Sequence, residues 1–109
     1  MLKDYVKLYV PSTRNINIPL SIDESKILVS QYASKLSHKF GGCTGTIGQG
    51  YYDASDGTQV IENVTILQSY YDTDKILAWD FIKSLALQLK VELTQESVTI
   101  ESNDGIEFI

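Results

Sequence analysis

Two segments of this chain carry apolar residues at helical spacing, and this feature constrains the fold more than any other. In the first segment, Leu28, Tyr32 and Leu36 recur at every fourth position, which gives an apolar stripe on a helix of about four turns. The second, at 72–91, has a stripe of the same spacing made of Ile76, Trp79, Ile82, Ala86 and Leu89. Each stripe needs an apolar surface to cover, so the helices are expected to lie on a sheet.

The segments around these helices read as β-strands. Residues 5–10, "YVKLYV", alternate strictly and direct Val6, Leu8 and Val10 inward. Residues 43–53 and 58–71 flank Asp56-Gly57, a hairpin-turn signal, and two short strands follow near 98–108. The order βαββαβ with an extra C-terminal strand predicts a ferredoxin-like α+β sandwich, one domain over 1–109, with both helices on one sheet face.

Local signals fix the ends of the helices. Asp23 is expected to cap the first helix, and Gly41-Gly42 to end it. Either Asp72 or Asp74 is expected to cap the second helix.

Six of the seven glycines lie between Phe40 and Gly57, which raises the question of a phosphate-binding loop. Such a loop follows a strand and opens a helix, whereas these glycines follow a helix and enter a strand. The hairpin interpretation is therefore favoured. Gly48 and Gly50 point to the same side of their strand, where a bulge, another backbone or a ligand can approach.

Composition excludes several classes of function. The net charge is −5 and the nine basic residues are dispersed, so no nucleic-acid footprint is expected. No apolar run is long enough to cross a membrane, and "MLKDYVKLYV" does not resemble a signal peptide, which predicts a cytoplasmic protein. The single Cys43 fits a reducing compartment, and no metal or cofactor motif is present. His38 is interpreted as a helix-end residue, not a catalytic group.

A small-ligand pocket is one candidate site. Glu62 interrupts an otherwise apolar strand, so it is either a polar group at the rim of a cavity or an edge-strand charge that discourages aggregation. If it is a rim group, the pocket is expected between sheet and helices, lined by Glu62, Glu96, Tyr51 and Trp79.

The sheet face without helices is the second candidate site. We expect it to carry tyrosine and threonine with few charges, a composition that commonly becomes buried against a second copy or a partner. The alternative is a solvent-exposed face whose tyrosine and threonine residues reflect β-propensity alone. The residues expected on this face are Tyr5, Lys7, Tyr9, Thr44, Thr46, Thr65 and Leu67.

Short motifs in two segments of the chain resemble those of known protein families. "GGCTGTIGQGYYDASDGTQVIENVTIL", followed about thirty residues later by "QESVTIES", resembles a family of small bacterial proteins of unknown function. The chain is also similar to accessory proteins encoded on plasmids and phages of Gram-positive bacteria. The resemblance implies the ferredoxin-like fold and no particular activity. The chain departs from the family pattern at Tyr51-Tyr52, where the family often has an indole.

Three functions follow from these features. The lack of a convincing catalytic set favours a non-enzymatic interaction or accessory protein, dimerising through the open sheet face and encoded by a mobile element. The alternative is a small-ligand binder or metal-free enzyme of the dimeric α+β-barrel type, with its pocket near Glu62 and Glu96. An acidic mimic of nucleic acid is the weakest hypothesis, because the acidic residues are scattered.

Overall fold

The computed structural model describes residues 1–53 and 55–109. Its main sheet is antiparallel and has five strands in the order β4-β5-β1-β6-β7. Their bounds are β1 Asp4–Pro11, β4 Thr44–Asp53, β5 Gln59–Tyr71, β6 Thr99–Ser102 and β7 Gly105–Phe108. A small hairpin of β2 (Thr13–Arg14) and β3 (Ile18–Pro19) follows β1, where the sequence indicated only a connection.

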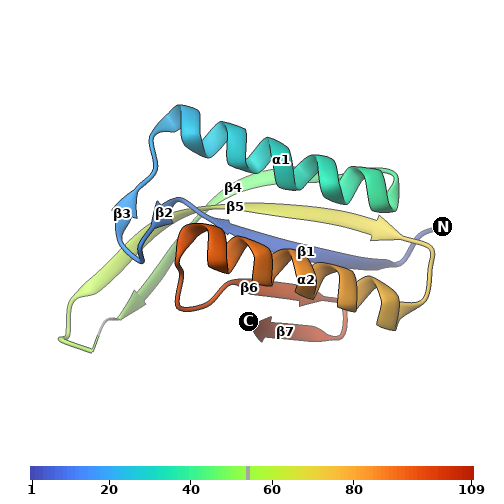
Figure 1. The fold of residues 1–109 in the computed structure, drawn as a ribbon. Helices are drawn as coiled ribbons and strands as arrows, with labels where there is room; N and C mark the ends of the chain where they lie inside the picture. Colours follow the sequence, from blue (N-terminus) through green and yellow to red (C-terminus); the bar gives the residue numbers. More distant parts are fainter. Residues whose placement is uncertain (54) are drawn as a thin grey trace.

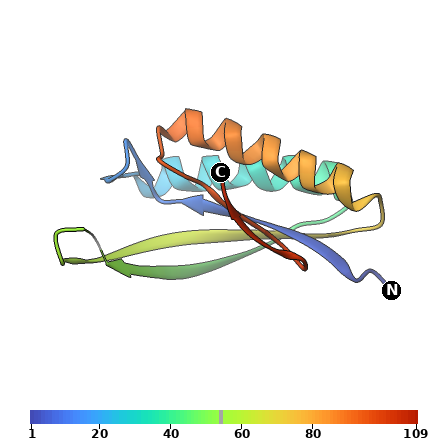
Figure 2. The same ribbon diagram turned by 90° about the horizontal axis from the view of Figure 1, so that it is seen from below.

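Both helices lie on the same face of this sheet (Figures 1 and 2). They are α1, Ile22–Phe40, and α2, Lys75–Leu93. With β1 and β5 at the centre, β4 and β6 outside them and β7 added at one edge, the strand order is that of the split βαβ plan. The predicted two-layer α+β fold is therefore confirmed. Within the described residues, neither helix is long and apolar enough to span a membrane.

The helix ends follow capping chemistry. Ser21, not Asp23, caps α1, because its hydroxyl accepts from the Glu24 amide while the Glu24 carboxylate accepts from the Ser21 amide. Asp23 instead lies in the first turn, where its charge suits the helix dipole. Gly41 ends α1 at φ 93°, and Asp74 caps α2, both as expected.

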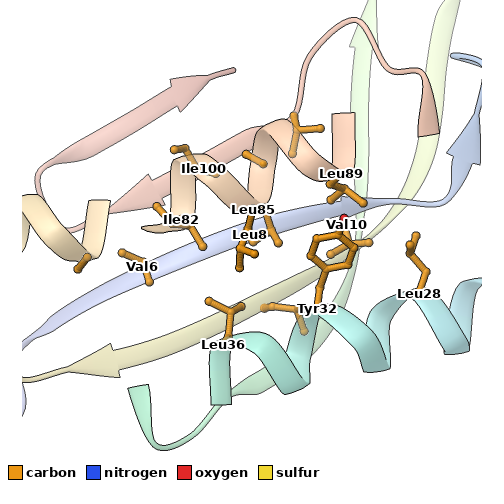
Figure 3. Packing of buried hydrophobic residues seen from close by; sticks show 14 of the residues in the cluster. Val6, Leu8, Val10, Leu28, Tyr32, Leu36, Ile82, Leu85, Leu89 and Ile100 are labelled. Atoms are coloured by element: carbon orange, nitrogen blue, oxygen red, sulfur yellow. The ribbon is translucent and has the colours of Figure 1, made fainter. Parts of the chain in front are cut away.

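The core lies between the helices and the sheet (Figure 3). Val6, Leu8 and Val10 of β1 are each no more than 1% exposed and lie beneath both helices. From α1 the stripe of Leu28, Tyr32 and Leu36 is buried, as the spacing predicted. From α2 the buried residues are Ala78, Ile82, Leu85, Ala86, Leu89 and Leu93.

The strand register decides which residues face the helices. Leu67 pairs with Leu8 on one side and Gly45 on the other, and Thr65 pairs with Val10. Because paired residues share a face, Thr65 and Leu67 lie under the helices, and Leu67 is only 1% exposed. The expectation that both lie on the open face was therefore wrong. Since side chains alternate with period two, a phase error of one residue moves a whole set to the other face.

Candidate functional site

The candidate site lies where the β4–β5 ribbon continues past the end of β1. The last pair between β1 and β5 is Pro11 with Val64, but β4 and β5 stay paired as far as Asp53 with Gln59. Figure 2 shows the far end of this ribbon reaching beyond both helices. On its open face Glu62 is opposite Gly50, and Tyr52 follows two residues later on the same face.

Hydrogen bonds join this ribbon to two loops. The Thr13 hydroxyl lies 3.3 Å from Glu62 Oε1 and 3.0 Å from the Ile16 carbonyl oxygen. The Gln95 amide nitrogen donates to the Thr13 carbonyl oxygen at 2.8 Å. Thr13 therefore connects the carboxylate on β5 to the loop between α2 and β6, which also carries Glu96.

The charges of Glu62 and Glu96 both act on the Tyr52 phenol. The pKa of the Tyr52 phenol is raised by burial, then by the charge of Glu62 and its hydrogen bond with that carboxylate, and then by the charge of Glu96. Tyr52 therefore keeps its proton at neutral pH. Among the described residues, no lysine or arginine forms an ion pair with either carboxylate, and Arg14 is paired with Glu24. The site is a pair of uncompensated carboxylates beside a protonated phenol, an arrangement suited to a cation.

Unusual backbone conformations occur in the two loops at this site. The non-glycine residues with positive φ in the described chain are Asn15 (47°), Ile16 (74°) and Thr94 (52°). A β-branched residue such as Ile16 or Thr94 rarely adopts this conformation, which costs on the order of 1–3 kcal/mol. The Asn15 amide donates to the Leu93 carbonyl at 2.8 Å and joins the loops. Strain of this kind concentrates at binding and catalytic sites.

Tyr51 does not belong to this site. It pairs with Ile61 on the opposite face of the ribbon, and its hydroxyl donates to Gln49 Oε1 at 3.0 Å. The expected pocket therefore contained the wrong one of two adjacent tyrosines. The sequence could have indicated Tyr52, because it lies two residues from Gly50 and so shares that residue's face.

Trp79 is also separate from Glu62 and Glu96. It lies in the first half of α2 beside a cavity that also contacts Val6, near the start of β1. Glu62 lies beyond the other end of β1. Placing Trp79 in one pocket with Glu62 was therefore wrong, because the length of β1 separates the two.

The remaining residues expected on the open face do lie there. Tyr5, Lys7 and Tyr9 alternate with the buried residues of β1, while Thr44 and Thr46 pair with Gln68 and Ile66. The Tyr9 hydroxyl donates to Glu101 Oε1 at 2.7 Å, and Lys7 Nζ lies 3.7 Å from the other oxygen of Glu101. Burial and the Glu101 carboxylate raise the pKa of Tyr9 to about 12.

Other reactive side chains lie apart from this site. Cys43 is half-buried, and burial raises the pKa of its thiol. His38 is in the last turn of α1. In the part of the chain that the structure describes, no group of three or more His, Cys, Asp or Glu side chains is arranged to hold a metal ion.

Comparison with known proteins places this fold beside one kind of enzyme. No protein-family model and no curated protein matches the chain. A structure of a phage SAM lyase in complex with S-methyl-5'-thioadenosine superposes with a TM-score of 0.73 and 15% identity over 97% of this chain and 88% of that chain. A phage SAM lyase in its apo state also gives 0.73, with 17% identity over 99% and 89%. At these identities the likeness establishes the fold.

These matches correct the functional expectation. The sequence favoured a non-enzymatic interaction or accessory protein, but both similar structures are of an enzyme. Thr13, Glu62 and Gln95 are far apart in the sequence and meet only in the folded chain, so no local motif joins them. The resemblance to small plasmid and phage accessory proteins stays a prediction.

Proposed function

We propose that this protein binds SAM, S-adenosylmethionine, and cleaves it to S-methyl-5'-thioadenosine. The observation that carries the proposal is the whole-chain likeness to a phage SAM lyase with S-methyl-5'-thioadenosine bound. A fold hosts many functions, so the proposal also needs a site with suitable chemistry. The cluster of Tyr52, Glu62 and Glu96 supplies it.

The charge of the substrate fits this cluster. SAM carries a positive sulfonium and a positive ammonium group against one carboxylate, so its net charge is positive. Glu62 and Glu96 have no cationic partner in the described chain and attract such a ligand. The Tyr52 phenol donates its hydrogen to Glu62, so its oxygen can accept a hydrogen bond from the ammonium group of the substrate, and the Thr13–Glu62 contact positions one carboxylate.

Cleavage without water can follow two balanced routes. In both, the bond between the sulfonium sulfur and the γ-carbon of the amino acid breaks, and sulfur keeps the electron pair. In the first route the substrate's own carboxylate attacks the γ-carbon and closes a lactone. In the second a base removes a proton from the β-carbon and leaves a vinyl amino acid. Glu62 or Glu96 would bind the ammonium group in the first route, and one of them would be the base in the second.

Incubation with SAM tests the proposal directly. The purified protein should convert SAM to S-methyl-5'-thioadenosine, followed by liquid chromatography with mass spectrometry. A lactone or a vinyl amino acid as second product distinguishes the two routes. If SAM neither binds, by calorimetry, nor turns over, the proposed function is wrong.

We also propose that the open sheet face assembles with a second copy of the chain as a homodimer. No described element covers that face, and it carries apolar side chains beside its tyrosines. Ile106 and Phe108 of β7 are 55% and 68% exposed there. A second copy would remove these side chains from water and enclose the ribbon that carries Tyr52 and Glu62.

A further inference from the structure

A cavity lies away from the Glu62 site, between α2 and the hairpin of β6 and β7. Its volume is about 510 Å³, within the range typical of small-ligand sites. The cavity exists because two helices cover the centre of the sheet and leave the added edge strand β7 without a helix above it (Figure 1).

The walls of this cavity are largely apolar. Trp79 and Ile76 line it from α2, and Val6 lines it from the sheet. Trp79 is only partly buried, while Ile76 is 71% exposed although it belongs to the apolar stripe of its helix. An indole face beside aliphatic side chains favours a flat apolar body.

Acidic side chains in and beside the cavity outnumber the basic ones: Lys75 and Asp104 line it, and Asp4 lies next to Lys75 outside the lining. Lys75 Nζ lies 3.6 Å from Asp4 and 3.4 Å from Asp104. Lys75 is thus paired with two carboxylates, so these three side chains together carry a net charge of about −1. Lys83 and Glu107 form a neutral pair at 3.7 Å beside the same cavity. The pKa of Tyr71, which lines the cavity, is raised by burial and next by Asp4, in keeping with a negative local potential.

From this combination we propose that the cavity binds a small amphipathic monocation, an amine attached to a flat apolar body. The body packs against Trp79, whose indole face also attracts a cation. The ammonium group binds beside Asp104 of the lining and neutralises the excess negative charge. An anion would be repelled by the excess negative charge, and a neutral analogue would leave that charge uncompensated.

Trp79 makes the test direct, because it is the only tryptophan of the chain. The probes are 2-phenylethylamine, 2-phenylethanol and phenylacetate, which share a ring and differ in charge. We expect the amine to change Trp79 fluorescence saturably and to bind most tightly, followed by the alcohol and then the acetate. Equal affinities, preference for the acetate, or no saturable change with any probe would overturn the proposal.

Two variants that each remove one carboxylate test whether Asp104 binds the amine. Asp104→Asn should weaken amine binding about threefold, the size expected for an exposed ion pair, while the alcohol is unaffected. Asp80→Asn, an exposed position of α2 outside the cavity lining, is the control for net charge and should leave amine binding unchanged. Equal weakening by both variants would contradict the assigned site.

Titration with SAM separates this cavity from the proposed reaction centre. We expect SAM to bind by calorimetry without displacing the amine from Trp79. Competitive displacement would show that the cavity is the SAM site itself and would overturn a separate amine site. If SAM fails to bind while the amine binds, the proposed function fails and the cavity stands.

Discussion

At the scale of single residues, the site depends on which of two adjacent side chains faces the carboxylates. Tyr51 and Tyr52 are both about half exposed, at 58% and 52%, but only Tyr52 shares a face with Glu62. The sequence identified Glu62 because it interrupts an apolar strand. It could not identify Thr13 or Gln95 as its neighbours, since Thr13 lies 49 residues away from Glu62 and Gln95 lies 82 from Thr13.

The two tyrosines provide a matched pair of variants. Tyr52→Phe removes the hydroxyl beside the carboxylates and should lower kcat/KM for SAM about tenfold, the upper range for one hydrogen bond. Tyr51→Phe removes a hydroxyl on the opposite face and should leave kcat/KM unchanged. Steady-state kinetics on both variants checks this, and equal losses would contradict the face assignment.

Glu62→Gln keeps the shape of the side chain and removes its charge. A hydrogen bond to a charged group contributes about 1.5–3 kcal/mol, so SAM affinity should fall between about tenfold and about a hundredfold. Glu107→Gln, on β7 and paired with Lys83, is the control. Calorimetric titration measures both, and circular dichroism verifies that each variant is folded. Unaltered affinity in Glu62→Gln would remove this carboxylate from the site.

At the scale of elements, the helices were predictable and the phase of β5 was not. Both helices occur where the apolar spacing and the capping residues predicted them, although Ile76 of the stripe predicted for α2 is 71% exposed. In β5, Val64 and Ile66 point to the open face while Ile61 and Leu67 point to the other. Because β5 has apolar residues on both faces, the alternation pattern does not indicate which face is buried. Only the pairing with Leu8 and Val10 decides the register.

Adjacent residues of β5 test that register. Leu67→Ala should destabilise the protein by about 2–5 kcal/mol, because it leaves a cavity in the core. Ile66→Ala, on the open face, should cost less than half as much in the isolated chain. Urea unfolding with a constant m-value gives both numbers, and a larger loss at Ile66 would contradict the register.

At the scale of the whole molecule, the fold was predictable and the proposed activity was not. The order of elements is local information, and it gave the strand order correctly. The site combines the ribbon end, a turn after β1 and the loop after α2, which come together only through the complete topology. A search for local motifs therefore finds no catalytic set and favours a non-enzymatic protein.

The proposed homodimer is a property of the whole molecule, and a charge on the open face tests it. Thr46→Lys puts a charge on the open face, on the edge strand β4, and should shift the protein from dimer to monomer, because burying an unpaired charge is costly. Gln49→Lys, an exposed position of β4 on the other face, should leave the assembly intact. Native mass spectrometry measures both, and a monomeric wild-type protein would contradict the homodimer.

The ribbon that carries Tyr52 and Glu62 extends past both helices, and the contact of Glu62 with Thr13 joins it to the rest of the chain near the point where it leaves the sheet (Figure 2). Its backbone hydrogen bonds have no helix packed over them, so they should open more readily than those of β1. A ligand that bridges Glu62 on the ribbon and Glu96 on the loop would hold the free end as well. Hydrogen exchange should therefore slow most at Gly50–Asp53 when SAM is added, and hardly at all in β1.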